Sequence, residues 1–173
     1  MPNNFSHITD EQADLIREAP VFFVASTAAD LSAGPLGQGP VNLSPKGATP
    51  LHIIDPNHVA YLDYKGSGNE TARHATSDGP ITVMVMSMGS EDAGIVRLYG
   101  HAKVVPLEGS SLFELLRESP AETLELPMRR VVEITVDSTQ TSCGYGVPVF
   151  TFVEQRTRFG RGRRYKASRA VQA

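Results

Sequence analysis

The stretch DYKGSGNETARH, residues 63 to 74, holds the residues whose types and spacing best suit the binding of an anion. Two glycines, Gly66 and Gly68, flank Ser67, and glycine allows a backbone to come close to a ligand. Ser67 and Glu70 have the spacing of a capping box, which predicts a helix over residues 70–77. Because the first turn of a helix presents unpaired N–H groups and a partial positive charge, this turn is a candidate phosphate cradle.

The turn differs from the two common phosphate-binding motifs. No Lys-Ser or Lys-Thr pair follows the glycines, so it is not a P-loop, and the three-glycine spacing of the dinucleotide fingerprint is missing. A plain capped turn without a ligand is therefore the alternative interpretation.

The elements that must position this turn are short strands with a few helices. A capping box at Thr9 and Gln12 predicts a helix that ends near Ala19, because Pro20 disfavours helical geometry in the residue before it. A second box, at Ser111 and Glu114, predicts a helix with its leucines on one stripe. Closely spaced strand patterns predict a mainly β fold, an antiparallel β-barrel with added helices. The predicted strands are 21–27, 41–47, 50–55, 58–64, 81–88, 95–105 and 129–139, and the predicted helices are about 9–19, 70–77 and 111–119.

Composition predicts an ordinary soluble protein. The 173 residues fit one domain, 1–173, with a basic tail at about 156–173 that holds seven of the 16 basic residues and no acidic residue. The tail lacks the interleaved aromatic residues of a base-stacking groove, so a solvated tail is the expectation and a nucleic-acid partner is not. No apolar run is long enough to cross a membrane and the N-terminus lacks a signal-peptide pattern, so a cytoplasmic location without membrane contact is expected.

Two predicted strands have faces whose residue types indicate what each face contacts. Alternation places Arg97, Tyr99, His101 and Lys103 on one face of the strand at 95–105, a face that suits either an anion or water. The strand at 81–88 is apolar on both faces, so its outer face needs a cover. A second copy of the chain is the simplest cover, which predicts a homodimer.

The order of VNLSPKG, AYLDYKGSGNETARH and VRLYGHAKVV resembles the FMN-binding family related to pyridoxamine 5'-phosphate oxidase, over roughly residues 20–136. The resemblance implies a split β-barrel homodimer that binds FMN at the subunit interface, with the phosphate near the turn described above. It implies that Asn42, Ser44 and Lys46 face the flavin and that Ser67 supplies a hydroxyl to the phosphate. The other cofactor-binding candidates are Tyr64, Lys65, Gly68, Asn69, Arg73 and Arg97.

The chain also departs from the oxidase. The two positions after the serine are usually Arg and Lys in the oxidase, whereas here they are Gly68 and Asn69. Lys65, Arg73 and Arg97 are the open alternatives for the missing phosphate charges. The tryptophan and arginine pattern at the C-terminus of the oxidase is absent too, so oxidation of pyridoxamine phosphate itself is not expected.

The spacing of residues predicts no Ser-His-Asp set, metal-binding cluster or close carboxylate pair. A bound flavin accounts for this, because the cofactor itself transfers the hydride or electrons. The resulting prediction is an FMN-dependent oxidoreductase acting on a small molecule that the sequence does not identify. Three alternatives stay open: a deazaflavin-binding split barrel, a haem-binding one with His74 or His101 as ligand, and a cofactor-free binding protein.

Overall fold

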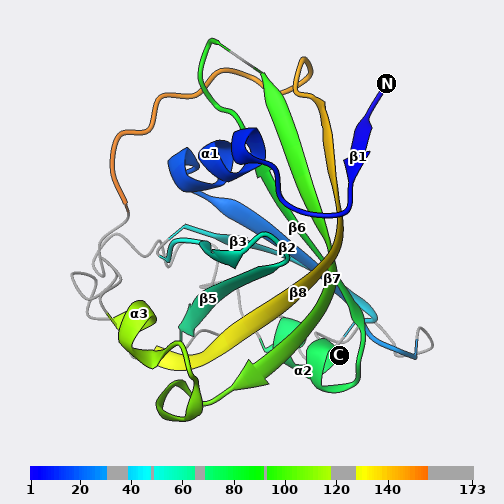
Figure 1. The fold of residues 1–173 in the computed structure, drawn as a ribbon, viewed down its shortest axis with the longest axis vertical. Helices are drawn as coiled ribbons and strands as arrows, with labels where there is room; N and C mark the ends of the chain where they lie inside the picture. Colours follow the sequence, from blue (N-terminus) through cyan, green and yellow to red (C-terminus); the bar gives the residue numbers. More distant parts are fainter. Residues whose placement is uncertain (31–38, 48, 65–68, 92, 118–127, 156–173) are drawn as a thin grey trace, which may run out of the picture.

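The computed structural model describes residues 1–30, 39–47, 49–64, 69–91, 93–117 and 128–155, so the predicted basic tail lies outside the described residues. Eight strands form one antiparallel sheet with few helices (Figure 1). The strands are β1 (Asn3–Phe5), β2 (Phe22–Thr27), β3 (Val41–Lys46), β4 (His52–Asp55), β5 (His58–Tyr64), β6 (Pro80–Met86), β7 (Gly94–Val105) and β8 (Met128–Cys143). The helices are α1 (Asp10–Glu18), α2 (Glu70–Thr76), the 3-10 turn η1 (Leu107–Gly109) and α3 (Phe113–Arg117).

The sheet curls until its two ends meet. The strand order is β3-β2-β6-β7-β8-β5-β4, with β1 added beside β8, so β3 and β5 lie near opposite ends of the sheet. Yet Lys46 of β3 forms an ion pair with Asp63 of β5, at 3.2 Å between Nζ and Oδ1. The rings of Phe22 and Tyr61 also meet edge to face, with centroids 5.3 Å apart. These contacts close the sheet into the predicted barrel.

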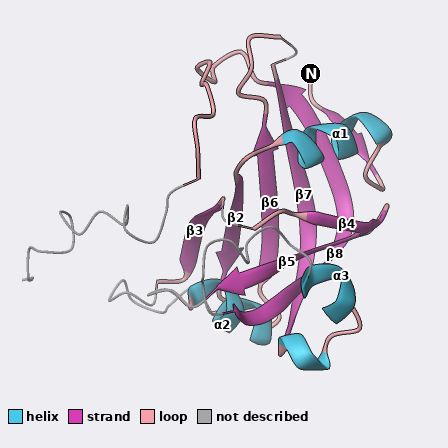
Figure 2. Cartoon of the chain, turned by 90° about the vertical axis from the view of Figure 1, so that its left-hand side faces the viewer, coloured by secondary structure: helices cyan, strands magenta, loops and turns pink. Residues whose placement is uncertain are grey.

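A helix covers each end of the barrel (Figure 2). The predicted capping box of α1 is confirmed, because Thr9 accepts from the Gln12 backbone while the Gln12 side chain accepts from the Thr9 backbone. Ala13 and Ile16 of α1 enter the core. At the other end α2 buries His74, whose Nδ1 lies 3.0 Å from the Ser26 hydroxyl of β2.

The strand β5 is buried on both of its faces. Val59 and Tyr61 belong to the main core inside the barrel, whereas Ala60 and Leu62 belong to a smaller core outside it. That smaller core is completed by residues from η1, α3 and β8, namely Leu107, Leu116 and Val131. The helical additions therefore cover the part of the sheet that would otherwise expose apolar side chains.

The prediction for the third helix is wrong in its start and in its stripe. The described part of α3, Phe113–Arg117, begins two residues later than predicted, and the predicted end at 119 lies outside the described residues. Leu115 is exposed while Leu116 is buried. The hydroxyl of Ser110, rather than that of Ser111, accepts from the Leu112 backbone and donates to Glu133 of β8. A bond to the sheet thus sets the start of this turn, and local spacing does not. The strand β1 was missed because its three residues carry no apolar alternation.

Gly100 of β7 lies where two strands come unusually close. A Cβ at this position would lie 1.9 Å from the carbonyl oxygen of Thr135 on β8, beside a register shift between Tyr99 and Gly100. A Cβ at Gly89, in the β6–β7 connection, would meet nothing within 4 Å.

We therefore expect Gly100→Ala to lower the free energy of unfolding by about 2–3 kcal/mol, since the backbone must move to admit the methyl group. Gly89→Ala is the matched control and should leave that free energy nearly unchanged. Urea unfolding of both variants checks this, and equal midpoints for Gly100→Ala and the unmodified protein would contradict the close approach.

Candidate functional site

A polar hollow of about 350 Å³ lies where the inner face of β3, the end of β5 and the start of α2 meet. It contains most of the cofactor-binding residues predicted from the sequence that the structure describes. The lining residues are Asn42, Ser44, Pro45, Lys46, Asp63, Tyr64, Asn69, Glu70, Thr71 and Ala72.

Alternation along β3 supplies one wall of the hollow. Asn42, Ser44 and Lys46 are half-buried, whereas the residues that alternate with them are exposed, with Val41 and Leu43 at 64% and 66%. This is the two-residue period of a strand with one face toward the barrel. The structure thus brings together the three residues that the sequence placed on one flavin-facing strand.

Hydrogen bonds hold this wall against α2. The Asn42 amide donates from Nδ2 to the hydroxyls of Ser44 and Thr71, each at 3.1 Å. Because both hydroxyls are also donors, they can pass a hydrogen bond on to a ligand. The wall therefore presents amide and hydroxyl groups of the kind that bind the polar edge of a heterocycle.

Two cations share one carboxylate at the base of the hollow. Asp63 accepts from Lys46 at 3.2 Å on one oxygen and from Nε of Arg130, on β8, at 3.2 Å on the other. The exposed fractions of the three side chains are only 20% for Lys46, 13% for Asp63 and 19% for Arg130. Partial burial strengthens these charge-assisted bonds relative to exposed ion pairs.

Arg130 was missed by the sequence analysis. It follows Arg129 at the start of β8 and lies directly opposite Asp63 in the β5–β8 pairing, and it also donates to the side-chain oxygen of Asn69. An Arg opposite an Asp on neighbouring strands is a typical stabilising pair, but that signal appears only once the pairing register is known.

Tyr61 lies beneath the cations and stays neutral. The Lys46 ammonium lies 5.6 Å from the centroid of its ring, a cation–π distance. Burial raises the pKa of the Tyr61 phenol well above its usual value, and its hydroxyl has no hydrogen-bond partner among the described residues.

The start of α2 differs from the predicted capping box. The helix begins at Glu70 with Asn69 as its N-cap, two positions after Ser67. The Glu70 carboxylate accepts from the Asn69 backbone N–H at 2.8 Å, and backbone hydrogen bonds keep the pKa of Glu70 low. The box predicted at Ser67 is wrong because the acid folds back over the adjacent amide. Lys65, Ser67 and Gly68 lie outside the described residues.

Two other predicted cations do not line the hollow. Arg73 is half-buried one turn into α2. Arg97 lies on the outer face of β7, where it donates to the Ser142 hydroxyl at 3.0 Å. Of the predicted cations that the structure describes, only Lys46 lines the hollow, while Arg130, on β8, bonds to two of its lining residues, Asp63 and Asn69.

The two histidines considered as haem ligands have different surroundings. His74 is buried with Nδ1 near the Ser26 hydroxyl and Nε2 3.2 Å from the Gly39 carbonyl, so both ring nitrogens are engaged. His101 is half-exposed and pairs through Nδ1 with Asp137. Within the part of the chain that the structure describes, no group of three or more His, Cys, Asp or Glu residues could hold a metal ion. That part also contains no helix long and apolar enough to span a membrane.

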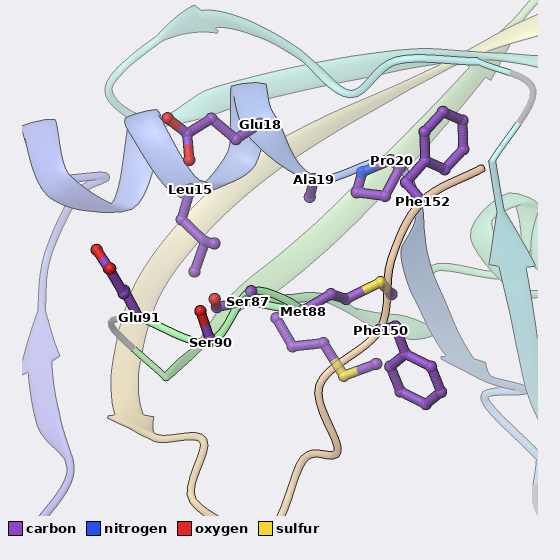
Figure 3. A pocket seen from close by; sticks show the side chains of 12 residues that line it. Leu15, Glu18, Ala19, Pro20, Ser87, Met88, Ser90, Glu91, Phe150 and Phe152 are labelled. Carbon is purple, nitrogen blue, oxygen red and sulfur yellow. The ribbon is translucent and has the colours of Figure 1, made fainter. Parts of the chain in front are cut away.

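A second hollow, of about 410 Å³, lies between the end of α1 and the β6–β7 connection (Figure 3). One wall is the C-terminal strap, residues 144–155, which is tied down by a backbone bond from Phe150 to Met88. In Figure 3 Phe150 lies beside Met88 and Phe152 beside Pro20. The charged residues that line this second hollow are the acids Glu18 and Glu91, so it does not suit a phosphate.

Tyr145, in the C-terminal strap, is 93% exposed.

Comparisons with known proteins agree with this geometry. The family model described as pyridoxamine 5'-phosphate oxidase matches residues 8–143. The pyridoxamine 5'-phosphate oxidase family protein ustO of Aspergillus flavus is 30% identical over 151 residues, which is 86% of this chain. The chain spans 57% of the length of that relative.

Two solved structures share the fold. A candidate pyridoxamine 5'-phosphate oxidase of Lactobacillus delbrueckii superposes with a TM-score of 0.57 at 22% identity, covering 80% of this chain and 97% of that one. HupZ of Group A Streptococcus gives a TM-score of 0.55 at 23% identity, covering 75% of this chain and 89% of the other. The barrel is therefore the split barrel of these relatives, and the chain belongs to the pyridoxamine 5'-phosphate oxidase family.

Proposed function

We propose that this chain is an FMN-binding oxidoreductase whose cofactor occupies the polar hollow beside β3. The observation that carries the proposal is the convergence of Asn42, Ser44 and Lys46 on one wall, facing the end of β5 and the start of α2. Membership of a family named for an oxidase of pyridoxamine phosphate supports the same class of chemistry.

The residues present suit such a ligand. Asn42 and Ser44 offer donors and acceptors to the polar edge of the flavin, and Lys46 offers a positive charge next to it. A cation near the ring favours the more negative, reduced flavin, which is one of the ways in which a protein tunes a cofactor. Asn69, Tyr64 and the predicted residues Lys65, Ser67 and Gly68 complete the proposed binding set, with Arg73 one turn away.

The bound flavin would supply hydride or electron transfer. The role of the protein is to bind the cofactor, to orient it and to shape the space for a small-molecule substrate. The ion pair with Asp63 holds the Lys46 side chain in place while this happens.

We further propose that the protein acts as a homodimer. The hollow is open on one side, and the outer face of the adjacent sheet is apolar across three strands, through Leu43 of β3, Phe23 of β2 and Met84 of β6. Phe23 lies opposite both Pro45 and Met84 in the pairing register, so these side chains form one continuous surface. A second copy would cover that surface and provide the missing wall.

Titration of the purified protein with FMN tests the cofactor. We expect saturable quenching of flavin fluorescence at micromolar or lower concentration and a yellow protein. A red protein would indicate haem instead, and binding of a deazaflavin in place of FMN would indicate the related cofactor. Absence of binding by all three would contradict the proposal and leave a cofactor-free barrel.

Ser67→Asp tests the predicted phosphate turn. The new carboxylate should repel the phosphate and weaken FMN binding roughly tenfold or more, because like charges at a phosphate site destabilise binding. Ser90→Asp adds the same charge in the exposed β6–β7 connection, away from the hollow, and should leave the affinity unchanged. Equal affinities for both variants would remove the turn from the site.

Leu43→Glu tests the dimer. A charge in the middle of the proposed interface should shift the mass in solution from that of two chains to the 18.7 kDa of one, as measured by sedimentation equilibrium. Leu115→Glu is the control, because Leu115 is also exposed but lies on α3, away from that surface. A monomeric unmodified protein would overturn the proposal of a shared site.

A further inference from the structure

Arg130 contacts the lining of the polar hollow from a strand that none of the recognised motifs includes. Its guanidinium donates to Asp63 through Nε and to the side-chain oxygen of Asn69 through Nη2. Both acceptors line the hollow. We propose that Arg130 is the residue that binds the phosphate of the cofactor and thereby selects FMN over the uncharged flavin, riboflavin. This inference rests on the proposed flavin site.

The charges around the hollow support an anion at this place. Lys46 and Arg130 share the single carboxylate of Asp63, which leaves an excess of positive charge within this buried trio. The other acid in the lining, Glu70, turns its carboxylate toward the backbone N–H of Asn69. Because the trio is less than about one fifth exposed, its charge is screened weakly by water.

Arg130 suits a phosphate better than Lys46 does. A guanidinium has five N–H donors in a planar fork that matches two phosphate oxygens, whereas an ammonium is a single point of charge. Nε of Arg130 is fixed by Asp63, which aims the rest of the fork toward Asn69. Lys46 is instead held over the ring of Tyr61, toward the interior of the barrel.

Asn69 marks the place that the phosphate would take. Its side-chain oxygen is a neutral acceptor for Arg130, close to the surface at the start of α2. A phosphate oxygen that replaced it would give the guanidinium an anionic acceptor instead of a neutral one, which adds Coulomb attraction to the hydrogen bond. The guanidinium is thus already ordered before the anion arrives, and little side-chain freedom is lost on binding.

Arg130→Gln provides the test, with riboflavin and FMN titrated separately into the unmodified and variant proteins. Loss of a charged partner to phosphate should weaken FMN binding roughly tenfold to hundredfold. Riboflavin lacks the phosphate, so its affinity should change less than about twofold. Arg17→Gln removes the same charge from the exposed side of α1, where Arg17 pairs with Asp14, and should change neither affinity.

Two further variants keep the test decisive if Arg130→Gln folds poorly. Arg130→Lys keeps the charge beside Asp63 but not the fork, so it should lose part of the FMN preference. Asn69→Lys combined with Arg130→Gln returns a cation to the same corner of the hollow and should restore most of the FMN affinity. A structural role alone would not be rescued by a cation on α2.

The outcomes separate the two proposals. If the unmodified protein binds FMN but Arg130→Gln leaves the ratio of FMN to riboflavin affinity unchanged, Arg130 is not the phosphate ligand and the flavin site stands. An equal loss for both ligands also overturns the inference, because it indicates a collapsed hollow. If the unmodified protein binds neither flavin, the proposed function fails and this inference fails with it.

Discussion

One partly buried carboxylate holds the molecule in its closed form. Asp63 accepts from a lysine on β3 and an arginine on β8, so a single side chain joins strands that are far apart in the order of the sheet. A carboxylate at this depth is costly unless it is paired, and a pairing with two cations leaves little freedom for either strand to move. The same contact therefore closes the barrel and sets the shape of the polar hollow.

The chain separates its polar and apolar hollows. Amide, hydroxyl and charged groups from β3, β5 and α2 line the first, whereas methionine and phenylalanine side chains of the β6–β7 connection and the C-terminal strap line the second. Each draws on segments distant in sequence, and the barrel brings them into place. A fold that fills its interior with apolar side chains leaves its chemistry to the ends of the strands, where polar groups need not be buried completely.

Much of this arrangement could be predicted from local patterns. Strand periods predicted β2 to β8 and the shared face of Asn42, Ser44 and Lys46, and the spacing of Thr9 and Gln12 predicted the start of α1. The features that were not predicted from the sequence depend on the tertiary fold. Arg130 meets Asp63 only because its strand pairs with β5 in one register, and Ser110 starts a turn because its hydroxyl donates to Glu133. The helix α2 begins at Glu70 as predicted, but local spacing did not predict its N-cap, Asn69, whose backbone N–H donates to the Glu70 carboxylate.

The alternation of inward and outward side chains along β3 couples cofactor binding to dimer formation. Its inward side chains line the polar hollow and its outward ones, among them Val41 and Leu43, belong to the apolar surface. A ligand that holds the inner row must also hold the outer row, because both belong to one short backbone segment. By thermodynamic linkage, the cofactor would then lower the concentration at which two chains associate, and association would tighten the cofactor in equal measure. An inserted or deleted residue in this strand would exchange the two rows and abolish both properties at once, so this strand tolerates replacement of side chains far better than a change of length.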